Sequence, residues 1–237
     1  MNVGQWICTV CGYNMIAKRP DVCPFCGADH SHFISGEEGE QTYKVTPKRI
    51  NDYVTQLLSV PRLGYEHAAY CVHTEDGMVW VDCPSVFNSG LAPVEAIYFT
   101  HHHFMGACNQ YQEVWGAKIH LHALDADLPL ARQFSVDESF YGGFTAHGIQ
   151  AFHIDGHTPG FTMYIYKSVL FICDYAFPLG SRMRLNPYGP QDKTRLGASK
   201  VIDLVAERPL EKVCGYNYVA EFDTWYHDFV RVVRQSG

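Results

Sequence analysis

Short runs of β-branched and aromatic residues, separated by turn residues, recur through most of the chain from residue 65 onward. The segment YEHAAYCVHTEDGMVWVDCPSVF, which begins at Tyr65, contains two such runs joined at an Asp-Gly turn, which predicts a β-hairpin. Further strands are predicted at 95–100, 117–123 and within 149–174. Helical periodicity is found at about 106–115, 193–207 and 221–234. Strands interleaved with a few helices favour an α/β domain whose helices pack on sheet faces.

The first forty residues lack this periodicity. They are followed by ISGEEGEQTYKVTP, residues 34–47, a polar segment that contains glycine and predicts a linker. We therefore predict two domains, residues 1–41 and residues 42–237. The smaller is too short to be held together by core burial alone, so it requires another source of stability.

Four cysteines supply that source. Cys8 and Cys11 form one C-x2-C pair, and after eleven residues Cys23 and Cys26 form another. Two such pairs place four thiolates around one ion, and both zinc and iron accept this ligand set. The other five of the nine cysteines are scattered, which argues against a disulfide framework and for a reducing compartment.

Details around the cysteines favour iron over a purely structural zinc. The sequences CTVCGY and CPFCG, together with the aromatic residues Trp6, Tyr13, Phe25 and Phe33, resemble the short-spaced rubredoxin domain of rubrerythrins. The resemblance covers residues 4 to about 34. It implies a single redox-active iron and one-electron transfer, although the four thiolates by themselves would also suit zinc.

Composition excludes several classes of partner. Hydrophobic residues make up 47% of the 237 residues and charged residues 18%, and the net charge of −7 comes with no basic run that would bind nucleic acid. No apolar stretch approaches the length of a membrane span, and the N-terminal residues lack the pattern of a signal peptide. We expect a cytoplasmic protein that acts on a small-molecule substrate, with a redox partner protein and a homo-oligomeric state as further expectations.

In the larger domain, the residues able to bind metal fall at predicted strand ends. THHHFMG, residues 100–106, follows a strand, and alternation along an extended chain sends His101 and His103 to one side and His102 to the other. His157 lies in the tight loop DGHTPG. Asp174 ends the apolar run VLFIC, where a carboxylate is costly unless it meets a cation. Together these four residues predict a metal site.

This set of motifs resembles the metallo-β-lactamase superfamily over roughly residues 45–235. THHHFMG is similar to the T-H-x-H-x-D-H motif, GHTPG to the second histidine loop, and FICDYAF to the strand that ends in the bridging aspartate. MVWVDCP resembles the early strand whose aspartate, here Asp82, lies beneath the site. The resemblance implies an αββα sandwich with metal at one edge, preceded by the rubredoxin-like domain.

The chain departs from the family at the second metal position. Met105 and Gly106 stand where the family has Asp and His, and Tyr216 and Asn217 stand where it has its last histidine. Methionine is a weak soft ligand and glycine supplies none. We therefore predict one ion, iron or zinc, at His101, His103, His157 and Asp174.

Other residues near the motifs have simpler interpretations. Asp82 is expected to orient a ligand imidazole. Cys108 and Cys173 are secondary candidates, because small buried thiols are common in protein cores. Four other histidines of the larger domain are interpreted as surface or packing residues: His102, His120, His122 and His147.

Three hypotheses for function follow. The leading one is an oxidoreductase in which a rubredoxin-like iron delivers electrons to a mononuclear non-haem iron at His101, His157 and Asp174, the catalytic residues, with dioxygen, nitric oxide or a sulfur species as substrate. The second is a zinc hydrolase of esters, thioesters or lactones that carries a structural zinc ribbon. The third is a non-catalytic metal-binding scaffold or sensor.

Overall fold

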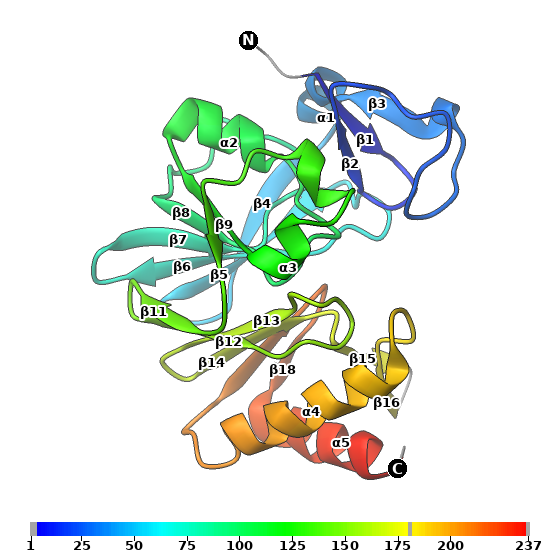
Figure 1. The fold of residues 1–237 in the computed structure, drawn as a ribbon. Coiled ribbons are helices and arrows are strands. Elements are labelled where there is room, and N and C mark those ends of the chain that lie inside the picture. The colour runs from blue at the N-terminus through cyan, green and yellow to red at the C-terminus, as the bar shows by residue number, and fades with distance from the viewer. Residues whose placement is uncertain (1–3, 180–181, 236–237) are drawn as a thin grey trace.

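The computed structural model describes residues 4–179 and 182–235. A small N-terminal unit sits against one edge of a larger two-sheet sandwich, as Figure 1 shows. The unit is a three-stranded antiparallel sheet of order β2-β1-β3. Its strands are β1 (Gln5–Cys8), β2 (Asn14–Ile16) and β3 (Phe33–Ser35).

Each cysteine pair of the N-terminal unit forms a tight turn. The amide of Gly12 donates to the carbonyl of Cys8 at 2.8 Å, and that of Gly27 donates to the carbonyl of Cys23 at 3.0 Å. Both glycines have positive φ, +81° and +77°, which a side chain would strain. The turns therefore direct both cysteines of each pair toward one point.

The prediction of a linker at residues 34–47 is wrong. Helix α1 (Gly36–Thr42) occupies it, and strand β4 (Lys44–Arg49) begins almost at once. Ser35 caps the helix through the amide of Glu38, and the Glu38 carboxylate accepts from the amide of Ser35. This capping box is a start signal that outweighs the polar, glycine-containing composition.

The first sheet of the sandwich has seven strands in the order β10-β9-β8-β7-β6-β5-β4. The predicted hairpin is present, with Thr74 paired to Gly77. The strands are β4, β5 (Val54–Val60), β6 (Ala69–Thr74), β7 (Gly77–Val81), β8 (Ala96–Tyr98), β9 (Lys118–His122) and β10 (Glu138–Phe140).

The second sheet has six strands in the order β11-β12-β13-β14-β17-β18, and a separate hairpin pairs β15 with β16. These strands are β11 (Phe144–Ala146), β12 (Ile149–His153), β13 (Thr162–Tyr166), β14 (Val169–Cys173), β15 (Ala176–Leu179), β16 (Arg182–Leu185), β17 (Lys212–Gly215) and β18 (Val219–Glu221).

Helices cover the outer faces of both sheets. The helices of the sandwich are α2 (Cys108–Trp115), α3 (Ala123–Ala126), α4 (Gln191–Val205) and α5 (Phe222–Gln235). Tyr111 of α2 packs on Trp80 of the first sheet at 4.8 Å between ring centroids. Helices α4 and α5 lie under the second sheet in Figure 1. The three predicted helices begin and end within two residues of α2, α4 and α5.

Alternation along the buried strands separates two cores. On β13, Tyr164 and Tyr166 face the core between the sheets, whereas Met163 and Ile165 join the core beneath α4 and α5. A strand that is apolar on both faces belongs in the middle of a layered fold. The predicted αββα sandwich is therefore confirmed. Within the described parts of the chain, no helix has the length and apolar character needed to cross a bilayer.

Candidate metal centres

The N-terminal unit brings its four cysteines together, and we call this group the thiolate centre: Cys8, Cys11, Cys23 and Cys26. The Sγ atoms of Cys8 and Cys26 are 3.7 Å apart, and those of Cys11 and Cys23 are 3.8 Å apart. A tetrahedron with metal–sulfur bonds of about 2.3 Å has edges of about 3.8 Å, so the four sulfurs fit one ion. Hydrogen bonds from Cys11 and Cys8 lower the pKa of the Cys23 thiol, which favours a thiolate there.

The sandwich brings together the other predicted group, which we call the His/Asp centre: His101, His103, His157 and Asp174. One ligand atom from each lies within 4.8 Å of the others. His101 and His103 follow β8, His157 lies between β12 and β13, and Asp174 follows β14. Strands of both sheets thus end at one edge, and their terminal loops supply all four side chains.

Hydrogen bonds set the direction of the imidazoles. His157 donates from Nδ1 to the carbonyl of Tyr188 at 3.0 Å, so its Nε2 presents a lone pair. That Nε2 lies 3.1 Å from Nδ1 of His103 and 3.5 Å from Oδ2 of Asp174. His101 Nε2 lies 3.6 Å from Oδ1 of Asp174. Several basic atoms therefore converge on one point.

Two atoms of this centre are buried without any hydrogen-bond partner in the described structure, His101 Nε2 and Asp174 Oδ1. Leaving such atoms unpaired is costly unless a cation lies between them. Burial also lowers the pKa of His101 well below its usual value, and lowers that of His103 to about 3, so both imidazoles are neutral. Neutral imidazoles and a carboxylate fit an iron or zinc ion.

Thr100 connects Asp82 to the centre. Asp82 accepts hydrogen bonds from the amide and hydroxyl of Thr100, both at 2.9 Å, and the hydroxyl oxygen lies 3.0 Å from Nδ1 of His101. The hydroxyl donates to the carboxylate and accepts from Nδ1, which leaves Nε2 of His101 free for a ligand role. Asp82 thus orients His101 through Thr100, and burial raises the pKa of Asp82 to about 7.

His102 points away from the centre, as alternation predicts. Its Nδ1 lies 3.0 Å from Oδ2 of Asp125, and its amide donates to the same oxygen at 3.1 Å. Asp125 also accepts from the hydroxyl of Thr158 and the amide of Gly160. The carboxylate ties the two histidine loops together, so His102 has a structural role.

Positions 105 and 106 offer nothing to a second ion. Met105 is buried in the core beneath α2. A Cβ atom at Gly106 would lie 2.3 Å from the carbonyl oxygen of Pro84, and φ is +55° there. A histidine cannot occupy position 106 in this backbone. The second metal position of the family therefore lacks its ligand residues here, and the packing leaves no room for a histidine.

Sequence reasoning missed His67, which lies beside the centre. Its Nε2 is 4.0 Å from Oδ2 of Asp174, and its ring centroid is 3.9 Å from that of Phe104. His67 belongs to the loop between β5 and β6, far from the motifs. A buried histidine directly before an apolar strand is a weak signal in a single sequence, since packing explains most of them.

The two centres adjoin. Phe25, between ligands Cys23 and Cys26, has its ring centroid 5.7 Å from that of His103 and 4.6 Å from that of Phe104. The two parts also meet at Gly64, where a Cβ atom would lie 2.1 Å from the carbonyl oxygen of Val10. The N-terminal unit therefore packs closely over the His/Asp centre.

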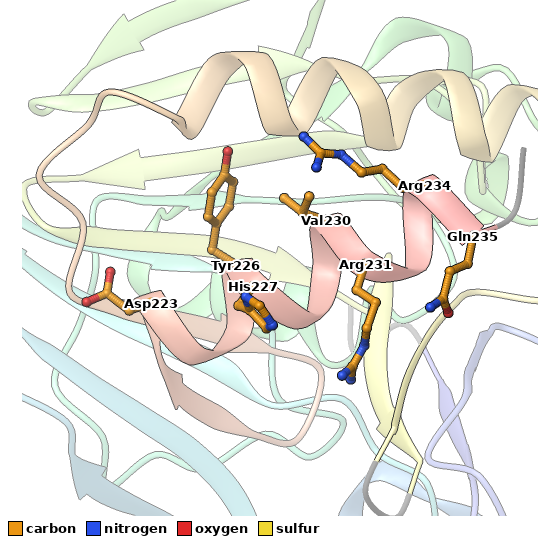
Figure 2. Close-up of a pocket in the computed structure, with 7 residues that line it drawn as sticks. All are labelled: Asp223, Tyr226, His227, Val230, Arg231, Arg234 and Gln235. Carbon is orange, nitrogen blue, oxygen red and sulfur yellow. The ribbon is translucent and has the colours of Figure 1, made fainter.

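One cavity lies away from both centres. It measures about 600 Å³ and is formed along α5 by Asp223, Tyr226, His227, Val230, Arg231, Arg234 and Gln235. Figure 2 shows Val230 and Arg234 on the side toward α4, with Arg231 on the other side. No ligand of either centre lines it, so the candidate chemistry does not depend on this cavity.

Residues 6–34 match the family model described as the rubrerythrin, rubredoxin-like domain. A comparison with curated proteins gave no significant match.

Solved structures similar to this chain include VMB-1 and several metallo-β-lactamases. VMB-1 has a TM-score of 0.64 at 17% identity and covers 83% of this chain and 100% of its own. A metallo-β-lactamase from Hirschia baltica has a TM-score of 0.61 at 14% identity and covers 80% and 97%. TTHA1623, solved in a di-iron-bound form, has a TM-score of 0.55 at 21% identity and covers 78% and 98%. The chain is thus a metal-binding protein that joins a rubredoxin-like domain to a domain with the metallo-β-lactamase fold.

Proposed function

We propose that this protein is an oxidoreductase in which an iron at the thiolate centre delivers electrons to a mononuclear non-haem iron at the His/Asp centre. Such an iron, when bound, supplies open positions for dioxygen, nitric oxide or a sulfur species. The residues that would hold it are His101, His157 and Asp174, with His103 as a fourth ligand.

The contact between Phe25 and His103 carries this proposal. Phe25 is adjacent in sequence to Cys26, a ligand of one centre, and its ring meets the ring of His103, a ligand of the other, at 5.7 Å and 60°. A purely structural zinc ribbon has no need to lie against a second metal centre. Covalent attachment also holds donor and acceptor at high effective concentration.

The exposure of Cys26 gives the thiolate centre a route to an external electron donor. Cys8, Cys11 and Cys23 are buried, whereas Cys26 is exposed. A redox partner protein that docks at the Cys23–Gly27 turn would approach the ion through the Cys26 sulfur. Electrons would then enter at Cys26 and leave toward His103.

The residues at the His/Asp centre favour small-molecule redox chemistry over hydrolysis. A hydrolase of this fold needs a group to orient the attacking water, and the resemblance implies an aspartate at position 105. Met105 cannot accept a proton and is buried in the core. Three of the four ligands are also deeply buried, with His101 2%, His157 4% and Asp174 8% exposed, which suits a substrate of few atoms.

The ligand residues of the two centres also support the choice of iron. The thiolate centre suits iron or zinc. The structure of TTHA1623 in a di-iron-bound form is a precedent for iron in a neighbour of this fold. Two histidines and one carboxylate are the ligand set typical of non-haem iron, so we propose iron at both centres.

The test begins with metal analysis and a visible spectrum of protein purified without added metal and without oxygen, then reoxidised. We expect two irons per chain and thiolate-to-iron absorption. The reduced protein is then mixed with dioxygen, nitric oxide or a persulfide, and the return of this absorption is followed in the wild type and in His157→Ala. Faster return in the wild type supports electron flow through the His/Asp centre.

Two results would contradict the proposal. Equal rates in both proteins with every oxidant would mean that the thiolate centre does not deliver electrons to the His/Asp centre. Zinc at both centres after growth in iron-rich medium, together with turnover of an ester, thioester or lactone, would favour a hydrolase instead.

A further inference from the structure

His67 is held rigidly at the edge of the His/Asp centre. It is 7% exposed, and its ring contacts those of Phe104, at 3.9 Å, and Tyr216, at 5.4 Å between centroids. These contacts and the burial restrict the plane of the imidazole, so its ring nitrogens have defined directions.

The loop that carries His67 is also fixed. The buried carboxylate of Glu66 accepts from the hydroxyl of Ser59 at 2.9 Å and from the amide of Ser85 at 2.9 Å. Gly64 of the same loop lies against the first cysteine turn, with no room for a side chain. The position of His67 is therefore set by contacts with both parts of the molecule.

Its two nitrogens have different partners. Nδ1 lies 3.4 Å from Sγ of Cys173, and Nε2 faces Oδ2 of Asp174 at 4.0 Å. A thiol is a weak donor and an anionic carboxylate is a pure acceptor, so the favourable arrangement has Cys173 donating to Nδ1 and the proton of His67 on Nε2. The Nε2–H bond then points toward the carboxylate side of the centre.

This direction makes His67 unsuitable as a ligand and suitable as a donor. A protonated nitrogen cannot bind a cation, and His67 lies outside the set of four residues whose ligand atoms are all within 4.8 Å of one another. Its Nε2–H is near Asp174 Oδ2 but too far from it for a good hydrogen bond, so the proton has room for another acceptor.

We propose that the Nε2–H group of His67 donates a hydrogen bond to a small anionic ligand bound at the open position of the His/Asp centre. The inference rests on metal occupancy of that centre, as in the proposed function, but not on iron or on electron transfer. Through this hydrogen bond, His67 makes the centre favour ligands of a few atoms that carry negative charge near the metal.

The test uses the full chain loaded with cobalt(II) at both centres and titrated with azide, a small anion, while visible absorption is recorded. Four thiolates leave no open position, so the spectrum of the thiolate centre serves as an internal reference. His67→Leu removes the donor, and His67→Gln replaces it with an amide N–H. We expect about 10- to 100-fold weaker azide binding in His67→Leu, since a hydrogen bond to a charged group typically contributes this much to affinity. His67→Gln should recover most of the affinity.

Each result decides a different point. Two cobalt ions per chain with unchanged azide affinity in His67→Leu would overturn the inference and leave the metal site intact. Loss of cobalt from the His/Asp centre in this variant would also overturn it, because His67 would then be a ligand. Wild-type protein with cobalt at the cysteines alone would overturn the metal site itself. His67→Met, similar in volume and without a donor, replaces His67→Leu if that variant does not fold.

Discussion

The ring of Phe25 lies 5.7 Å from the ring of His103, although 77 residues separate them in the chain. One ring belongs to the loop that carries two cysteine ligands, and the other belongs to a ligand of the His/Asp centre. The chain thus places two metal centres on either side of a single aromatic contact.

Changing Phe25 to Leu should slow electron transfer from the thiolate centre, because the aromatic bridge to His103 is lost. The measurement is the rate at which thiolate-to-iron absorption returns after the reduced protein meets dioxygen or nitric oxide. Trp6→Leu is the matched control, since Trp6 is an aromatic residue of the same unit that packs on Arg19. An equal rate in wild type and Phe25→Leu would show that the ring contact does not matter for transfer.

Changing His157 to Ala should remove metal from the His/Asp centre alone. His157 Nε2 lies within 3.5 Å of both His103 Nδ1 and Asp174 Oδ2, so its loss opens the ligand set. We expect metal analysis to fall from two ions to one per chain, with thiolate absorption retained. His227→Ala, on α5, is the control and should keep both ions. Equal loss from both centres would refute the independence of the two ligand sets.

Changing Thr100 to Val should weaken metal binding without removing any ligand. The hydroxyl of Thr100 connects Asp82 to His101, and groups that orient ligand imidazoles typically contribute about 10- to 100-fold in affinity. Competition with a chelator measures this loss at the His/Asp centre, with the thiolate centre as reference. Wild-type affinity in Thr100→Val would mean that packing alone orients His101.

Changing Gly64 to Ala should separate the N-terminal unit from the sandwich. The new Cβ atom would lie 2.1 Å from the carbonyl oxygen of Val10, and φ is +51°. We expect a loss of about 2 kcal/mol or more in unfolding free energy. The readouts are chemical denaturation and faster proteolysis after residue 35.

Gly116→Ala isolates the effect of backbone strain, because Gly116 also has positive φ, +73°, but nothing lies within 4 Å of its Cβ position. It should cost less than Gly64→Ala and leave proteolysis of the N-terminal unit unchanged. Similar effects of the two substitutions would mean that strain, and not the contact with Val10, accounts for the result.

Acid should destabilise the protein through His67 when the His/Asp centre holds no metal. Burial lowers the pKa of His67 from 6.5 to about 4. Between these values the unfolded chain binds a proton that the folded chain does not, so stability is full above pH 6.5 and is lost as pH falls toward 4. From pH 7 to pH 5 the loss is about 2 kcal/mol.

The measurement compares wild type with His67→Gln, both metal-loaded at the cysteines only, by urea unfolding at pH 7 and pH 5. The two proteins are compared because Asp82 has the opposite effect on stability. Burial raises the pKa of Asp82 to about 7, so its protonation stabilises the folded state as pH falls. His67→Gln should lose less stability than the wild type on acidification. The same loss in both proteins would exclude His67 as the source.

Local patterns account for the elements and ligand types that could be predicted. The C-x2-C-Gly turns need only adjacent residues, and the helices at 193–207 and 221–234 follow from apolar spacing. The composition of residues 34–47 predicts a linker, but the Ser35 and Glu38 capping pair begins a helix there.

The sequence by itself determined the candidate ligands and the order of the motifs, because each motif is a short run of residues whose chemistry is local. Only the tertiary structure decided that Phe25 meets His103, that Gly106 has no room for a side chain, and that His67 lies beside Asp174. Each of these contacts joins segments far apart in the chain, and packing of the N-terminal unit and the two sheets brings them together. The spacing of residues in one sequence carries no record of such contacts.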